Sequence, residues 1–135
     1  MSDQSSSSHA TPRVCVFDLD GVLFRGETVI PDAPPTLERL RARGHRLFFL
    51  TNNSSQPRRT YVEKLTRLGM PCTEDEIVTS ASATAHYLTR VRGAAGACVF
   101  GVGGPGIADE LGRVGLRVRT VADPEEGDRD ADFVV

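Results

Sequence analysis

Short apolar runs alternate with amphipathic segments along this chain of 135 residues. The continuous apolar run at 14–17 predicts a strand that is buried on both faces, since such a strand has no polar side. The segment from Arg46 to Leu50 predicts a second buried strand. Asp32 is placed to cap a helix that stops at Gly44. A second helix is predicted after Pro57, and its apolar face is formed by Tyr61, Leu65 and Leu68. This alternation of strands and helices predicts an α/β fold with a parallel sheet.

The same alternation starts again near Ser80 and predicts a second unit. Its expected elements are a helix at 83–91, a strand at 97–102, a helix at 107–114, a strand at 116–121 and an apolar segment at 131–135. We therefore predict a disordered polar tail at 1–11, a first domain at 12–80 and a second at 81–135. A terminal carboxylate within a sheet would be costly to bury, so we expect the sequence to be truncated.

Composition narrows the classes of function. The net charge of −2 gives no electrostatic reason to expect nucleic acid or a membrane surface as a partner. No apolar stretch has the roughly 18–20 residues needed to span a bilayer, and residues 1–11 lack the apolar segment of a secretory signal. The cysteines, Cys15, Cys72 and Cys98, are widely spaced and form no CxxC pair. We therefore predict a reduced, cytoplasmic protein.

Polar residues follow the first two predicted strands. Asp18 and Asp20 end the first strand, and Thr51 ends the second. Ligands of parallel sheets bind beyond the carboxyl ends of the strands, so these side chains are candidates for one site. Gly21 allows a tight turn whose N–H groups could cradle an anion. Two carboxylates beside such a turn suit Mg²⁺ together with a phosphate group, although an isolated DxD also serves simply to cap a loop.

Two longer motifs carry a resemblance to a known family. Residues 16–23 (VFDLDGVL) and 49–55 (FLTNNSS) resemble the first and second motifs of the haloacid dehalogenase-like (HAD) phosphatases. The segments YVEKL at 61–65 and EIVTSA at 76–81 resemble subclass IIA, which includes p-nitrophenyl phosphatase, phosphoglycolate phosphatase and pyridoxal phosphate phosphatase. The resemblance implies an incomplete Rossmann-like HAD core followed by the start of an α/β cap domain.

The resemblance also implies a role for each site residue. Asp18 would be the nucleophile that forms an aspartyl-phosphate, and Asp20 would be the general acid and base. Mg²⁺ would be held by the Asp18 carboxylate and the Asp20 carbonyl. Thr51 would bind a phosphoryl oxygen, helped by the backbone of Gly21 and Asn52. The implied substrate is a small phosphorylated metabolite, and the cap would carry a homodimer contact.

Two parts of the family pattern are missing, namely a later basic residue and a later acidic cluster. Lys64 is the only lysine, but it lies off the apolar face of its helix and is expected to be solvated. Asp128, Asp130 and Asp132 are expected to be solvated turn residues. We therefore expect an exposed hydrophobic sheet edge and little or no phosphatase activity in the chain by itself.

Two alternatives remain open. The segment GVGGPG at 101–106 matches the dinucleotide fingerprint, lies between a predicted strand and helix, and has Asp123 about 20 residues beyond its start. It would make the second unit an NAD-binding domain, although Pro105 removes one N–H group from the loop. The other alternative is a non-catalytic chain that binds phosphate compounds or another protein.

Overall fold

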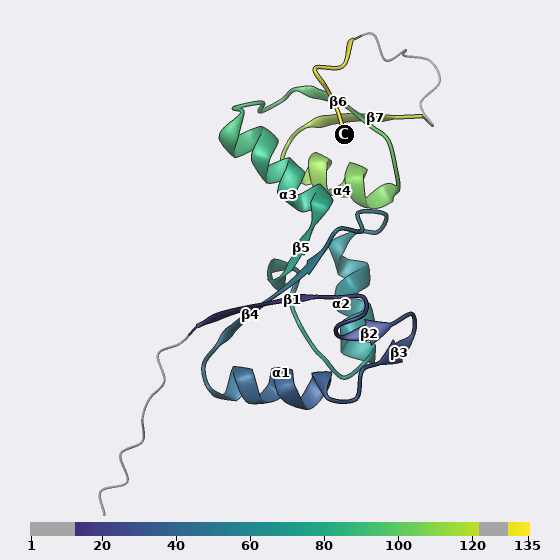
Figure 1. Ribbon diagram of the computed structural model, residues 1–135. Coiled ribbons are helices and arrows are strands. Elements are labelled where there is room, and N and C mark those ends of the chain that lie inside the picture. Colours follow the sequence, from purple (N-terminus) through teal and green to yellow (C-terminus); the bar gives the residue numbers. More distant parts are fainter. Residues whose placement is uncertain (1–12, 122–129) are drawn as a thin grey trace, which may run out of the picture.

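A computed structural model describes residues 13–121 and 130–135 of the chain (Figure 1). The predicted tail at 1–11, together with Asp123 and Asp128, lies outside the described residues. Figure 1 shows two bodies, each with helices packed against a small sheet. In the parts of the chain that the structure describes, no helix is long and apolar enough to cross a membrane.

The first body is built on a parallel sheet with the strand order β1-β4-β5. Its strands are β1 (Val14–Asp18), β4 (Arg46–Thr51) and β5 (Ile77–Thr79). The first two were predicted, whereas β5 was not predicted as a strand. Because β1 and β4 are parallel neighbours, with Asp18 opposite Leu50, their carboxyl ends meet at one edge.

Three further segments complete this body. A hairpin of β2 (Phe24–Arg25) and β3 (Thr28–Val29) follows β1 directly. Helix α1 (Ala33–Ala42) begins after Asp32, as predicted, and helix α2 (Arg58–Arg67) begins after Pro57. The predicted capping role of Asp32 is wrong, because its side chain makes no capping hydrogen bond. A short 3-10 helix, η1 (Glu74–Glu76), precedes β5. The hydrophobic core of the body includes Leu19, Phe24, Phe49, Leu65 and Ile77.

The second body contains a parallel sheet with the order β7-β6-β8. Its elements are α3 (Ser80–His86), the π-helix η2 (Tyr87–Val91), β6 (Cys98–Gly101), α4 (Pro105–Arg113), β7 (Arg117–Thr120) and β8 (Phe133–Val134). Helices α3 and α4 pack together and enclose a separate buried cluster that includes Ala85, Val99 and Leu111. This agrees with the predicted α/β class of both units, while the domain limits stay a prediction.

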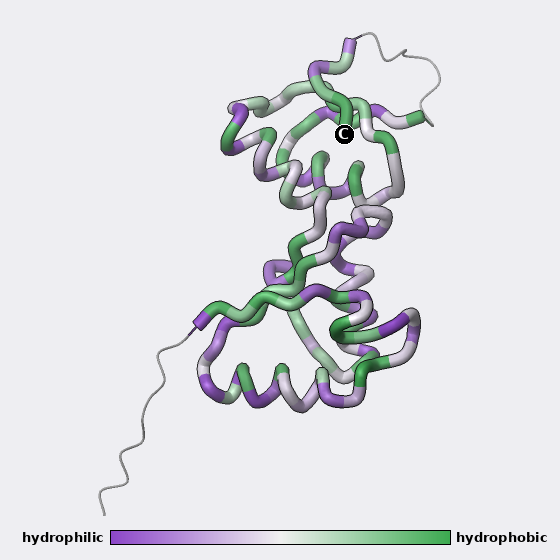
Figure 2. Tube along the Cα trace, viewed as in Figure 1, coloured by the Kyte–Doolittle hydropathy of each residue, from purple (hydrophilic) through white to green (hydrophobic). Residues whose placement is uncertain are grey.

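One prediction about β1 is wrong. Val14 and Val16 are 58% and 57% exposed, so this strand is not buried on both faces. The same prediction is wrong for β4, in which Leu47 and Phe49 are buried while Leu50 is 39% exposed. Figure 2 shows the apolar stretch that runs along β1 and β4. Among the described residues, β1 pairs only with β4 and no helix covers the face of Val14 and Val16. The expected exposed hydrophobic edge is therefore present at β1.

Candidate active site

A cavity of about 490 Å³ lies at the carboxyl ends of β1 and β4. The side chains that matter for chemistry come from the last residues of these two strands, from the loops that follow them and from helix α2. The lining residues are Asp18, Leu19, Asp20, Phe24, Gly26, Thr51, Asn52, Asn53, Tyr61 and Lys64. The cavity thus brings Asp18, Asp20 and Thr51 together, because parallel strands present their carboxyl ends at the same edge of the sheet.

The loop after β1 holds its two carboxylates by burying the residue between them. Leu19 is only 1% exposed, while Asp18 and Asp20 are exposed on either side of it. The Leu19 carbonyl accepts a hydrogen bond from the Leu23 N–H at 2.9 Å, which closes the turn. The side-chain alternation of an extended segment therefore directs both aspartates away from the core.

Gly21 forms the tight turn that the sequence predicted, and its N–H group has a partner within the chain. Gly21 has a φ of +85°, in the left-handed region that glycine adopts at low cost. Its N–H donates to the Phe24 carbonyl at 2.7 Å, and it is not among the residues that line the cavity. Gly21 therefore shapes the turn, and its N–H group is already used within the chain.

The loop after β4 is held by hydrogen bonds from its own side chains and from two neighbouring helices. The Thr51 hydroxyl oxygen accepts the Asn53 N–H at 3.1 Å, and the Asn53 amide oxygen accepts the Ser55 N–H at 2.9 Å. Tyr61 donates its hydroxyl hydrogen to the Asn53 carbonyl at 2.9 Å, and Ser80 donates to the Asn52 carbonyl at 2.9 Å. The Thr51 hydroxyl donates to no acceptor among the described residues, so its hydrogen is available to an anion.

Lys64 corrects another prediction. Its side chain is only 21% exposed and lines the cavity, so it is not a solvated residue of the outer helix face. Its ammonium lies 4.1 Å from the centre of the Phe24 ring and 3.3 Å from a carboxylate oxygen of Glu27. The sequence placed Lys64 correctly on α2. It gave no sign that the β2–β3 hairpin packs against that face of the helix.

The oxygen atoms at the cavity suit a hard divalent cation. Magnesium is usually held by one or two carboxylates, with waters and substrate phosphate completing its octahedron. Asp18 and Asp20 supply two carboxylates, but the described residues contain no group of three or more histidine, cysteine or acidic side chains placed for a metal ion. Asp132 is not part of this site, because its carboxylate accepts the Cys98 N–H at 2.8 Å in the second body.

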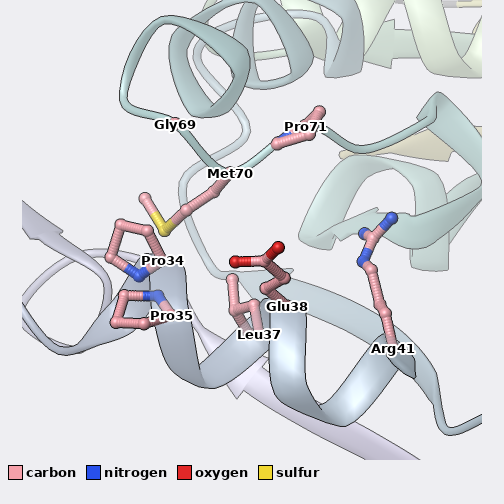
Figure 3. Close-up of a pocket in the computed structure, with 8 residues that line it drawn as sticks. All are labelled: Pro34, Pro35, Leu37, Glu38, Arg41, Gly69, Met70 and Pro71. Carbon is pink, nitrogen blue, oxygen red and sulfur yellow. The ribbon is translucent and has the colours of Figure 1, made fainter. Parts of the chain in front are cut away.

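A second cavity, also of about 490 Å³, lies along α1 (Figure 3). Pro34, Pro35 and Leu37 face Met70 and Pro71 across it, with the charged Glu38 and Arg41 further along the helix. The first cavity contains paired carboxylates and a hydroxyl donor, whereas this one is mainly apolar. It has no arrangement suited to acid–base or nucleophilic chemistry.

The glycine-rich turn before α4 packs against the loop that follows β4. A Cβ atom on Gly104 would lie 2.4 Å from the Ser55 carbonyl oxygen, and one on Gly106 would lie 2.4 Å from the carbonyl oxygens of Ser54 and Gln56. The Gly106 N–H faces the Ser55 carbonyl at 3.4 Å. These glycines allow one backbone to approach another, and the start of α4 faces a carbonyl oxygen of the same chain. No open phosphate cradle is present at this turn, and Asp123 lies outside the described residues.

Comparison with known proteins connects both bodies to one family. Residues 15–117 match the family model described as haloacid dehalogenase-like hydrolase. The chain is 44% identical over 126 residues to human glycerol-3-phosphate phosphatase, covering 88% of this chain and 39% of that protein. It is 39% identical over 114 residues to the chloroplastic phosphoglycolate phosphatase 1A of Arabidopsis thaliana, covering 84% and 31%. The chain therefore spans well under half the length of these relatives.

Solved structures give the same relationship. The glycerol phosphate phosphatase of Mycobacterium tuberculosis in complex with magnesium is 36% identical, with a TM-score of 0.69 over 79% of this chain and 31% of that one. The 4-nitrophenylphosphatase of Thermotoga maritima is 27% identical, with a TM-score of 0.75 over 90% and 42%. The fold predicted from the two motifs, a Rossmann-like core followed by a second α/β unit, agrees with these structures.

Proposed function

This chain belongs to the haloacid dehalogenase-like hydrolase family, and we propose that it acts as a magnesium-dependent phosphatase on a small phosphate monoester. The observation that carries the proposal is the cavity at which Asp18, Asp20 and Thr51 meet. The names of the relatives, which include glycerol-3-phosphate and phosphoglycolate phosphatases, support a small substrate.

The chemistry begins with Asp18, the nucleophile. One of its carboxylate oxygens attacks phosphorus and forms the aspartyl-phosphate, while the bond from phosphorus to the leaving oxygen breaks. Asp20 gives its proton to that oxygen as the alcohol departs. Asp20 then takes a proton from water, which attacks phosphorus and releases phosphate and the free Asp18 carboxylate. Each carboxylate thus ends the cycle in its starting state.

The other cavity residues position and neutralise the phosphoryl group. Thr51 donates its free hydroxyl hydrogen to a phosphoryl oxygen, and Asn52 lines the cavity beside it. Magnesium, held by the Asp18 carboxylate and the Asp20 carbonyl, would supply positive charge that offsets the charge on phosphate. Each contact between a carboxylate and a phosphate charge costs about 4 kcal/mol at 4 Å if the effective dielectric constant is about 20. Only Lys64 is cationic among the described lining residues, so turnover by this chain is expected to be slow.

Location and assembly complete the proposal. Cys15, Cys72 and Cys98 are all free thiols, which supports a reducing compartment such as the cytoplasm. A homodimer through the second body is proposed from the resemblance to subclass IIA.

The test uses p-nitrophenyl phosphate labelled with ³²P and the whole 135-residue chain. We expect magnesium-dependent release of p-nitrophenolate, or covalent labelling of the protein that hydroxylamine removes, as expected of an acyl phosphate. Asp18→Asn should abolish both signals, and EDTA should abolish them until Mg²⁺ is restored. Asp32→Asn is the matched control, because Asp32 is exposed at the start of α1 and does not line the cavity. The absence of both signals in the wild type, or their survival in Asp18→Asn, would overturn the proposal.

A further inference from the structure

Lys64 stands apart from the other residues of the candidate active site by its charge. Asp18 and Asp20 are the acidic residues of the cavity, and Lys64 is the only cationic residue among the described residues that line it. A dianionic phosphate entering this space meets like charges on one side and a single ammonium on another. The ammonium is therefore the feature of the cavity that favours an anion before any metal is considered.

The ammonium of Lys64 is held at the cavity wall by two contacts. It lies over the face of the Phe24 ring at 4.1 Å, where a cation is attracted to the aromatic face. It also lies 3.3 Å from Glu27, in the turn of the β2–β3 hairpin. The side chain of Lys64 is 21% exposed and that of Glu27 is 71% exposed, so the carboxylate lies on the solvent side of the pair.

Glu27 pairs with a second cation, so Lys64 can leave it without leaving the Glu27 carboxylate unpaired. Arg67 donates to the other Glu27 carboxylate oxygen at 2.5 Å from the next turn of α2. When Lys64 turns toward an anion in the cavity, Glu27 keeps Arg67 as its partner. The side chain of Lys64 can therefore change partner without leaving a carboxylate unpaired, and its contact with Phe24 keeps the ammonium beside the cavity.

We propose that Lys64 is a phosphate-binding residue of this site, stored against Glu27 and Phe24 and transferred to the phosphoryl group when it enters. The inference rests on the proposed function for the position of that group. Without phosphate, the Lys64 ammonium pairs with Glu27, which also binds Arg67. When phosphate enters, the ammonium turns toward the part of the cavity that Asp18 and Thr51 line. The competing explanation is that Lys64 only fastens the hairpin to α2.

Arg67 separates the two explanations, because it binds the same carboxylate but does not line the cavity. Inorganic phosphate is titrated into the whole chain by calorimetry, with Mg²⁺ in excess. Lys64→Met should weaken phosphate binding roughly tenfold or more, the scale of one charge-assisted contact. Arg67→Met should change it by less than about twofold, since an exposed ion pair contributes little. Lys64→Arg should restore most of the affinity.

Each other result overturns a defined part of the proposal. Equal binding by Lys64→Met and the wild type rejects the role of Lys64. If Lys64→Met and Arg67→Met weaken phosphate binding equally, Lys64 only holds the β2–β3 hairpin to α2, and its proposed role in binding phosphate is also rejected. Circular dichroism checks that each variant is folded, and methionine preserves the apolar stem that packs on Phe24. If the wild type binds phosphate through Lys64 but shows no Asp18-dependent turnover or labelling, only the enzymatic proposal fails. If the wild type binds no phosphate but retains Asp18-dependent turnover or labelling, only the proposal for Lys64 fails. If it shows neither phosphate binding nor an Asp18-dependent signal, both fail.

Discussion

Arg58 and Glu110 form an ion pair between the two bodies, with 2.7 Å between the Arg58 Nε and a carboxylate oxygen of Glu110. The Glu110 side chain is only 4% exposed, and Arg58 also donates to the Glu74 carbonyl at 3.1 Å. Arg58 is the first residue of α2, while Glu110 lies in α4. The pair therefore joins the helix that follows the Thr51 loop to the helix that follows the glycine-rich turn.

Glu110→Ala should lower the free energy of unfolding by about 2–4 kcal/mol, because it leaves the largely buried Arg58 without its carboxylate. The measurement is urea denaturation followed by circular dichroism. Arg59→Gln is the comparison, since Arg59 pairs with Asp109 at 2.9 Å but is 54% exposed. That change should cost less than about 1 kcal/mol. Equal losses in the two variants would show that burial does not set the strength of these pairs.

The glycines of the turn before α4 give a second prediction. Gly104→Ala and Gly106→Ala should each destabilise the chain by about 1–3 kcal/mol, because the new methyl group would meet backbone that has to move. The Cβ positions lie 2.4 Å from carbonyl oxygens of the Ser54–Gln56 segment. Thermal unfolding measures the effect.

Gly112 in the same helix is the matched control for these alanine substitutions. Outside the neighbouring backbone of its own helix, a Cβ on Gly112 would have no described atom within 4 Å, so Gly112→Ala should be neutral or stabilise by up to about 1 kcal/mol through helix propensity. If all three variants behave alike, the turn does not depend on close backbone approach.

Cys72 provides a prediction about pH. Burial, with a contribution from the Glu76 carboxylate, raises the pKa of the Cys72 thiol to about 11, while Arg41 acts in the opposite direction. Only the thiolate reacts quickly with iodoacetamide. At pH 8 the folded chain should therefore be alkylated at Cys72 on the order of 100-fold more slowly than the urea-unfolded chain, since each unit of pKa is a factor of about ten.

Alkylation is measured by mass spectrometry of the peptide that contains Cys72. Glu76→Gln should speed the reaction in the folded chain, because it removes a negative charge that raises the pKa of Cys72. Since the folded state holds this proton more tightly than the unfolded state, stability is full below a pH of about 9 and falls as the pH rises toward 11. An equal rate in folded and unfolded chains would contradict the raised pKa.

The sequence predicted those parts of the fold that depend on local pattern. The apolar segments predicted β1 and β4, and Pro57 predicted the start of α2, because such signals act within a few residues. Strand β5 has three residues, too few for a periodic pattern to be read. The exposure of Val16 depends on which elements cover the sheet, and an apolar run carries no information about that.

The site residues also fall into those that local sequence predicts and those that depend on tertiary packing. Asp18, Asp20 and Thr51 follow from the rule that ligands gather at the carboxyl ends of parallel strands. Lys64 depends on the position of the β2–β3 hairpin in space, which two-residue strands do not reveal. Lys64 is three residues beyond Tyr61, and residues three apart are neighbours on a helix surface. This spacing is the one local signal that could have indicated that Lys64 lies near the site. The sequence also could not show that the Gly21 N–H donates to the Phe24 carbonyl, because that hydrogen bond depends on how the turn folds.

Gly104 and Gly106 pack against residues 54–56, which lie about fifty residues earlier in the chain. The two segments are therefore expected to move together. The loop that begins at Thr51 continues directly into this contact. A chimaera that takes the turn from one relative and the loop from another would therefore shift Thr51 relative to the second body. Recombination within this family would have to exchange the turn and the loop as a pair.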